Sequence, residues 1–182
     1  IRRANAMIEK IPEIDASEAV KNHWLGVGRL MRAYNYFQLV RMFGDVPYTE
    51  LKLNVDNEDV LYGPRTNRDQ VMDYVLEDLN FAAANINQTY STIKWSRDMA
   101  NAMKADICLW EGTFRKYRNS ADDQPAADAA GAQKFLQACK DACQQIMNRD
   151  YSLGASYQAT YNSTTLTDSY EVIFGKEYKQ NV

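Results

Sequence analysis

The sequence predicts an all-α fold, and three observations support this prediction. Apolar residues recur at intervals of three and four over five long stretches of the chain. Glycine, proline, asparagine and aspartate gather between these stretches, where they end helices. Small residues such as Ala100, Ala105, Ala138 and Ala142 allow helices to approach closely. We therefore expect helices packed in pairs and joined by loops of uneven length.

Length and composition predict one domain spanning residues 1–182. The chain has 182 residues, of which 46% are hydrophobic and 25% are charged, so it can bury a core. Its net charge of −3 argues against nucleic acid as a partner. No apolar run reaches the ~18 to 20 residues that span a bilayer. The chain does not begin with Met, and we expect a fragment of a larger protein, with any membrane association arising from a lipid anchor outside this sequence.

The first stretch is residues 1–11, which predicts the end of a helix stopped by Pro12. Asp15 and Glu18 then have the spacing of a capping box and are expected to open a long helix that runs to Phe43. Gly44 suits the left-handed position after a helix, and Pro47 cannot continue the helix, so its end is specified twice.

The long helix is expected to lie at the centre of the fold, because apolar residues cover most of its circumference. Two adjacent apolar faces are predicted to be buried: Val27, Leu30, Tyr34, Phe37 and Arg41 on one, and Ala33, Tyr36, Val40 and Phe43 on the other. Arg32, Asn35 and Gln38 form a narrow polar stripe, which is expected to be solvated or hydrogen-bonded.

The remaining helices are predicted from the same periodicity. Residues 44–65 lack it and predict a long loop, after which Thr66 and Asp69 resemble a capping pair for a helix over 66–86. Ser96 or Asp98 is expected to cap a helix that ends near Tyr117. Residues 119–131 predict a flexible linker, residues 132–149 the last strong helix, and residues 171–178 a short extended segment.

Residues for catalysis or cofactor binding are not evident, so we expect a protein that is not an enzyme and carries no metal or cofactor. Phosphate loops, catalytic triads and zinc motifs are absent from the sequence, and His23 is the single histidine. Cys108, Cys139 and Cys143 are expected to be free thiols, since the last two lie one turn apart on a predicted helix.

Aromatic residues in the loops are the better candidates for ligand binding. The chain has 12 Tyr, 6 Phe and 3 Trp, and those at helical spacing are expected to fill the core. The loop aromatics are Tyr48, Tyr62, Tyr90, Trp95, Tyr157 and Tyr161. A ring in a loop can stack on a sugar, contact a protein or bury its own loop. We take Trp95, Tyr90 and Tyr62 as candidate ligand-binding residues.

The expected helix pairs resemble tetratricopeptide repeats, which would form a right-handed solenoid-type scaffold, although the repeat spacing is irregular. Five ordered blocks add a more specific resemblance. These are LMRAYNYFQLVRMFGDVPYTE (30–50), TNRDQVMDYVLEDLNFAA (66–83), MANAMKADICLWEGTFRKYRN (99–119), QKFLQACKDACQQIMNRDYSL (133–153) and SYEVIFGKEY (169–178). In type and order they resemble motifs of the SusD/RagB family, including its Gly-Asp-Val-Pro turn.

The resemblance implies a SusD-like component of nutrient uptake at the outer membrane of Bacteroidetes-type bacteria. Such proteins are surface-exposed lipoproteins with tetratricopeptide-like helices, and they cap a SusC-like TonB-dependent transporter without catalysing a reaction. Their ligand is usually a polysaccharide or oligosaccharide, and it is peptide in RagB-type members. Two functions therefore stay open: glycan binding, and a scaffold that binds only peptide or protein. The resemblance supplies no ligand residue for these blocks.

Overall fold

The computed structural model describes residues 1–87, 93–122, 124–162 and 169–176. Within these ranges the regular structure is helical, and the one β-type pairing is an isolated bridge between Val46 and Thr66. The prediction of an all-α fold is therefore confirmed. No helix in the described ranges has both the length and the hydrophobicity that crossing a membrane requires.

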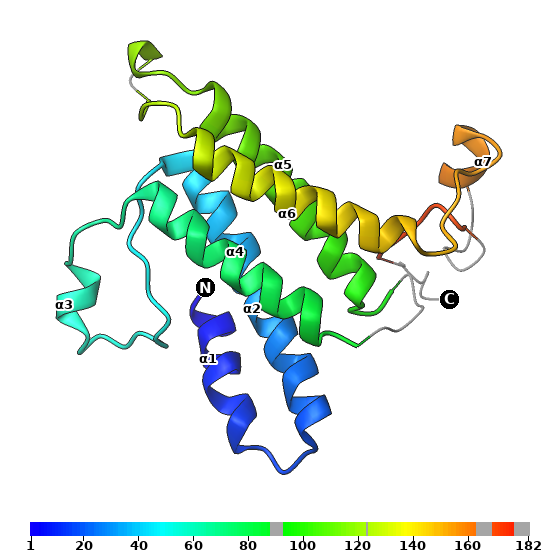
Figure 1. Ribbon diagram of the computed structural model, residues 1–182. Coiled ribbons are helices and arrows are strands. Elements are labelled where there is room, and N and C mark those ends of the chain that lie inside the picture. Colours follow the sequence, from blue (N-terminus) through cyan, green and yellow to red (C-terminus); the bar gives the residue numbers. More distant parts are fainter. Residues whose placement is uncertain (88–92, 123, 163–168, 177–182) are drawn as a thin grey trace.

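Four long helices and one shorter one form the body of the molecule (Figure 1). They are α1 (Arg2–Lys10), α2 (Glu18–Phe43), α4 (Arg68–Asn85), α5 (Arg97–Tyr117) and α6 (Ala129–Met147). Short helices interrupt the connections: α3 (Glu58–Leu61), α7 (Tyr157–Tyr161) and the 3-10 turns η1 (Ile11–Glu13) and η2 (Ser120–Asp122). The main packing pairs are α2 with α4 and α5 with α6, while α4 also packs on α5. This is the predicted arrangement in pairs, and the curvature of a solenoid stays a prediction.

The central helix α2 ends as predicted. Gly44 has a φ of 70°, and its N–H donates to the carbonyl oxygen of Val40 at 2.9 Å. A residue with a Cβ is strained at this φ, so glycine fits the position. The predicted start is wrong: Ser17 occupies the N-cap position, and Asp15 lies before it in the turn.

The core is built mainly on one side of α2. Leu30, Ala33, Tyr36 and Phe37 are at most 3% exposed, and they pack against apolar residues of α4 and α5. Three residues of the predicted buried faces are not buried, because α1 and α4 cover only part of the circumference of α2. These are Tyr34, 41% exposed, Phe43, 62% exposed, and Arg41, which is also exposed.

Arg32, a residue of the predicted polar stripe, is buried rather than exposed to solvent. This residue is only 3% exposed, and its guanidinium bonds to Asp78 of α4. The stripe is therefore hydrogen-bonded at Arg32 but enclosed rather than solvated. Asn35 is exposed and donates within α2 to the carbonyl oxygen of Met31.

Polar side chains cap the beginnings of three of the long helices. The side chain of Ser96 accepts from the N–H of Met99 at the start of α5, which confirms one of the two predicted caps. For α4 the cap is Asn67, which accepts from the N–H of Asp69, so the predicted Thr66 cap is wrong by one residue. Asp128 caps α6 in the same way.

A second group of buried charges lies where α4, α5 and the start of α6 meet. Arg68 donates to both carboxylate oxygens of Glu111, which is fully buried. Arg115 donates to Glu111 at 2.6 Å and to Asp128 at 3.1 Å. Arg118 donates to both oxygens of Asp69. The charged residues of the sequence blocks therefore join these helices to one another.

The α5–α6 contact is close because Gly112 has no side chain. A Cβ at this position would lie 2.7 Å from Cγ and 3.1 Å from the backbone nitrogen of Leu136. The backbones of the two helices therefore approach at a point where even alanine would force a shift.

Candidate functional site

The candidate ligand site is a hollow between the start of α5, the end of α7 and the turn at residues 171–176. We call it the aromatic groove, and its volume is about 700 Å³. It is lined by Met99, Ala102, Met103, Thr160, Tyr161, Glu171, Val172, Ile173, Phe174, Gly175 and Lys176. Thioether, phenol, carboxylate and ammonium groups thus line one hollow. This mixture of apolar and polar groups suits an amphipathic ligand.

Hydrogen bonds hold the loops that form this groove. Asp98, which is 2% exposed at the start of α5, accepts from the hydroxyl of Tyr151 at 3.0 Å and pairs with Arg149 at 3.5 Å. Glu171 accepts from the N–H of Gly154 at 3.0 Å and from the hydroxyl of Thr160 at 3.2 Å. The chain after α6 is therefore tied to α5, and α7 is tied to the turn that faces it.

Two ring pairs lie in or beside the aromatic groove. Tyr157 and Tyr161 stack with centroids 4.4 Å apart and remain 78% and 70% exposed. Phe174 lies 5.8 Å from Trp95 at an interplanar angle of 32°. An exposed flat ring can pack against the C–H face of a sugar, while carboxylate and hydroxyl groups bond the sugar hydroxyls. The groove therefore has the two kinds of contact that a saccharide requires.

Two of the candidate residues from the sequence, Trp95 and Tyr62, are not brought together. Trp95 lies beside the aromatic groove through its contact with Phe174, and it also packs on the core. Tyr62 is 84% exposed directly after α3, at the opposite end of the molecule in Figure 1. Tyr90 lies outside the described residues. Ligand binding by these three residues stays a prediction.

Sequence reasoning did not select Glu171 or Phe174, which the tertiary structure places in the groove. It named Tyr157 and Tyr161 only among the loop aromatics. A signal for that pair was available, because residues four apart on a helix lie on one face and can stack. No comparable signal links residues 171–176 to α5, since their contact depends on the path of the intervening chain.

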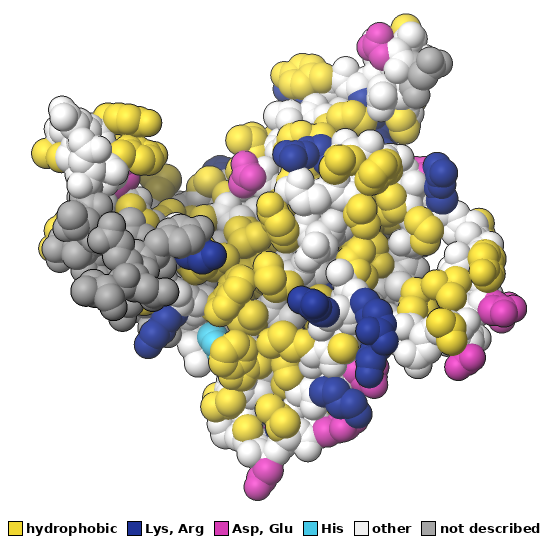
Figure 2. Space-filling view, turned by 180° about the vertical axis from the view of Figure 1, so that it is seen from behind, with side chains coloured by type: hydrophobic (Ala, Val, Ile, Leu, Met, Phe, Trp, Pro, Cys, Tyr) yellow, Lys and Arg dark blue, Asp and Glu magenta, His cyan; other side chains and the backbone are white. Residues whose placement is uncertain are grey.

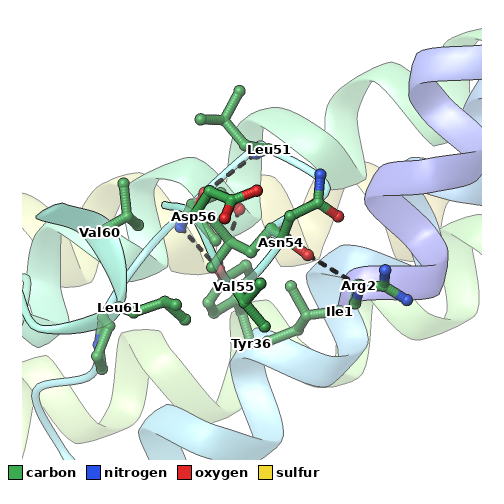
Figure 3. Close-up of a pocket in the computed structure, with 12 residues that line it drawn as sticks. Ile1, Arg2, Tyr36, Leu51, Asn54, Val55, Asp56, Val60 and Leu61 are labelled. Carbon is green, nitrogen blue, oxygen red and sulfur yellow. Dashed lines mark hydrogen bonds between the residues drawn. The ribbon is translucent and has the colours of Figure 1, made fainter. Parts of the chain in front are cut away.

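A second hollow lies between α1, α2 and the segment 47–61 (Figure 3). We call it the apolar groove, and its volume is about 900 Å³. It is lined by Ile1, Arg2, Tyr36, Pro47, Thr49, Leu51, Leu53, Asn54, Val55, Asp56, Val60 and Leu61. Seven of the twelve lining side chains are apolar, and this hollow has room for apolar side chains of a ligand.

The three cysteines and the single histidine are all at least partly buried. Cys108 is buried, which raises the pKa of its thiol to about 12, and Cys139 and Cys143 are half-buried. All three cysteines are free, as predicted. His23 accepts from the N–H of Asn87 at 3.0 Å through Nδ1, and burial lowers its pKa. The described residues contain no group of three or more side chains placed to hold a metal ion.

Comparison with known proteins gives consistent matches. Residues 1–109 match a family model of SusD-like proteins, described as starch-binding and associating with the outer membrane. The chain is 33% identical over 111 residues to SusD-like protein P38 of Formosa agariphila, covering 60% of this chain and 21% of that protein. The chain therefore spans about a fifth of that relative.

Solved structures share the fold. A SusD-like protein from Bacteroides fragilis has a TM-score of 0.74 and 22% identity, covering 100% of this chain and 32% of that one. A laminarin-binding SusD-like protein has a TM-score of 0.67 and 20% identity, covering 88% of this chain and 32% of that one. The similarity to these structures is one of fold, and it extends over the helices described above.

Proposed function

Because the chain belongs to the family of SusD-like proteins, we propose that it is part of a non-catalytic protein that binds glycan during nutrient uptake. The family match over residues 1–109 is the observation that carries this proposal. The ligand class is a polysaccharide or oligosaccharide, in keeping with the described starch binding of the family and with a structural neighbour that binds laminarin.

The aromatic groove is the proposed place of glycan contact within this chain. Its exposed Tyr161 and Phe174 offer flat faces, and Glu171 offers a carboxylate beside them. Trp95 lies 5.8 Å from Phe174 and is proposed to contribute through that contact. Tyr90 and Tyr62 remain proposed as additional contacts, with Tyr62 the more exposed of the described candidates.

A SusC-like TonB-dependent transporter is the proposed protein partner, and the proposed location is the outer membrane at the cell surface. Exposed apolar side chains on α2 support a protein contact, since exposed apolar surface commonly marks interaction sites. They are Val20, Trp24 and Tyr34, each between 41% and 42% exposed. Hydrophobic side chains are widespread on the face that carries the single histidine (Figure 2). The attachment to the membrane is proposed to be a lipid anchor outside these residues.

Peptide capture is the alternative function, and the apolar groove is the observation that favours it. Half of its lining residues are leucine, isoleucine or valine, which suit the side chains of a peptide better than the hydroxyls of a sugar. Under this alternative the aromatic rings of the aromatic groove would have no role in ligand binding.

Affinity measurements on the full-length protein test the proposal. A panel of soluble polysaccharides in native affinity electrophoresis, followed by calorimetry with the matching oligosaccharides, should show saturable binding without product release. Copurification with a SusC-like transporter is expected from native membranes. Retention by none of the glycans, together with saturable binding of peptides, would favour the alternative, and glycan hydrolysis by the purified protein would contradict a non-catalytic role.

A further inference from the structure

A third hollow lies where the end of α2, the start of α4 and the second half of α5 meet, at the end of the body opposite α7 (Figure 1). We call it the turn pocket, because the turn at Gly44 forms part of its wall, and its volume is about 640 Å³. Residues 40–45, Arg68, Trp110, Phe114, Gln124 and Pro125 line it. It shares no lining residue with the aromatic groove or the apolar groove, so it is a separate candidate site.

Aromatic rings form one wall of the turn pocket. Trp110 and Phe114, one turn apart on α5, stack with centroids 5.3 Å apart and ring planes inclined by only 4°. Phe37 of α2 packs edge-on against Trp110, and the guanidinium of Arg68 lies 4.2 Å from the centroid of Phe114. Phe43, the last residue of α2, adds a ring that is 62% exposed. The wall therefore has a fixed flat surface and a further ring that a ligand can reach.

The turn after α2 holds a carboxylate in place beside these rings. Val46 pairs with Thr66 through two backbone hydrogen bonds, at 2.9 and 3.3 Å, which fix the turn against the start of α4. Oδ1 of Asp45 accepts from the N–H of Arg68 at 2.7 Å. Its Oδ2 accepts no hydrogen bond within the described part of the chain. The turn pocket thus contains a prepositioned acceptor, and preorganisation of this kind lowers the entropy that binding costs.

Hydrogen-bond donors lie in the same lining. Arg41 donates to the side-chain oxygen of Gln38 at 2.8 Å through one terminal nitrogen, and its other two nitrogens have no acceptor among the described residues. The amide of Gln124 is exposed and bonds to no side chain or backbone group in the described ranges. The turn pocket therefore offers both donors and acceptors that a ligand can use.

The charges that face the turn pocket are balanced. The guanidinium of Arg68 donates to both carboxylate oxygens of Glu111 and to Asp69, so its charge is already compensated. One exposed cation, Arg41, and one exposed carboxylate, Asp45, remain. This balance favours an uncharged ligand. A sugar ring is one that presents a C–H face to an aromatic ring and hydroxyls that both donate and accept.

We propose that the turn pocket is a second saccharide-binding site, in which a neutral sugar unit packs on Phe43 and Trp110 and hydrogen-bonds to Arg41, Asp45 and Gln124. The inference rests on the proposed function for its ligand class, while the site is separate from the aromatic groove. Two sites on one protein raise the avidity for a polysaccharide that reaches both of them.

Carbene footprinting of the full-length protein locates the sugar contacts. A photoactivated diazirine labels accessible side chains, and mass spectrometry of the peptides measures how far a bound sugar masks them. The probes are maltoheptaose, laminarihexaose and a xylogluco-oligosaccharide, which represent the glycans named for the family and for two structural neighbours. At least one probe should mask residues 41–45 and 110–125 saturably, in addition to the peptides of the aromatic groove.

Two variants remove different contacts of the turn pocket. Phe43→Ala removes the exposed ring and should raise the sugar concentration for half-maximal masking there by about fivefold to tenfold. Gln124→Ala removes one neutral hydrogen-bonding group and should raise it by about threefold. Met147→Ala is the matched control: Met147 is the last residue of α6, as Phe43 is of α2, and is 81% exposed. It should leave the masking unchanged.

Tyr161→Ala separates the two sites. In this variant the turn pocket should still be masked, while masking of the aromatic groove declines. Masking confined to the aromatic groove, or equal masking in wild type, Phe43→Ala and Gln124→Ala, overturns this inference and leaves the proposed function standing. Absence of masking at both sites overturns both.

Other occupants of the turn pocket give different footprints. Residues 41–45 that stay unlabelled without sugar would show that the rest of the polypeptide covers the pocket. Masking by a tryptic peptide digest, but by none of the three oligosaccharides, would show a peptide site. Either result overturns the proposal.

Discussion

Arg32 of α2 and Asp78 of α4 form a two-pronged ion pair inside the protein. Nε and one terminal nitrogen of Arg32 donate to the two carboxylate oxygens at 2.7 and 2.8 Å, and the side chains are 3% and 4% exposed. Burial alone would lower the pKa of Arg32, but the hydrogen bonds and charge of Asp78 raise it above its usual value. The arginine therefore stays charged, and the pair fixes how α2 packs on α4.

Arg32→Met should destabilise the protein by about 3 to 5 kcal/mol, because it leaves the buried carboxylate of Asp78 without its hydrogen-bonded partner and with only the more distant Arg29, at 3.8 Å. The double variant Arg32→Met/Asp78→Leu should recover most of this loss, since an apolar pair replaces an ion pair. Urea titration measures both values. Lys10→Met, which removes a solvent-exposed pair with Glu13, is the control and should leave the unfolding midpoint unchanged. A double variant no more stable than Arg32→Met would contradict this account.

Phe37→Ala should destabilise the fold by roughly 3 to 5 kcal/mol, because the ring is 3% exposed and packs edge-on against Trp110. Tyr34→Ala, on the open side of the same helix, should cost less than about 1 kcal/mol. Chemical denaturation of the two variants compares neighbouring helical positions that periodicity alone treats as equivalent. Similar losses for both would mean that α2 is covered on its outer side.

Acid should weaken the α4–α5 charge cluster through Asp69. Burial opposes ionisation of this carboxyl, yet the hydrogen bonds of Arg118 and the charges of Arg115, Arg118 and Arg68 lower its pKa in the folded protein. A lowered folded-state pKa stabilises the protein above the unfolded-state value of ~3.9, and this stabilisation is lost as pH falls through the folded-state value.

The matching experiment compares wild type with Asp69→Asn by urea titration from pH 7 down to pH 3. The stability difference between them should be largest near neutral pH and should shrink below about pH 4. Asp59→Asn, at an exposed position on α3, should run parallel to wild type throughout. A difference for Asp69→Asn that is independent of pH would rule out this assignment.

Cys108 should be unreactive in the folded protein. Its burial raises the pKa of the thiol to about 12, so little thiolate exists at pH 8. Iodoacetamide at that pH, followed by peptide mass spectrometry, should modify Cys108 only in denaturant. Modification of native Cys108 as fast as of Cys139 would show that the α5–α6 contact opens readily.

Tyr161→Ala should weaken oligosaccharide binding by the full-length protein by about fivefold to tenfold, the effect of one lost ring contact of 1 to 1.5 kcal/mol. Glu171→Gln should weaken it as well, because a charged acceptor becomes a neutral one. Tyr117→Ala is a matched control. Tyr117 is 71% exposed, against 70% for Tyr161, and it lies at the end of α5 that is away from the aromatic groove. If calorimetry shows an equal loss of oligosaccharide affinity for Tyr117→Ala and Tyr161→Ala, this would argue against the aromatic groove as the glycan-binding site.

The sequence by itself determined the local structure and the family. Helical periodicity, the Gly44 stop and the Ser96 cap depend on residues within one or two turns, so they can be read from neighbours in the chain. The same reasoning placed Asp15 and Thr66 as caps in error, because several polar residues compete at a helix start and the backbone path selects one of them.

Only the tertiary structure decided which side of each helix is covered. Tyr34 and Phe37 fit the same periodic pattern, but α4 and α5 pack on one side of α2, which leaves Tyr34 in solvent and buries Arg32 beside Asp78. The aromatic groove likewise joins α5, α7 and the turn at residues 171–176. The separation along the chain carries no information about these contacts, because they arise from the packing of whole helices rather than from local preference.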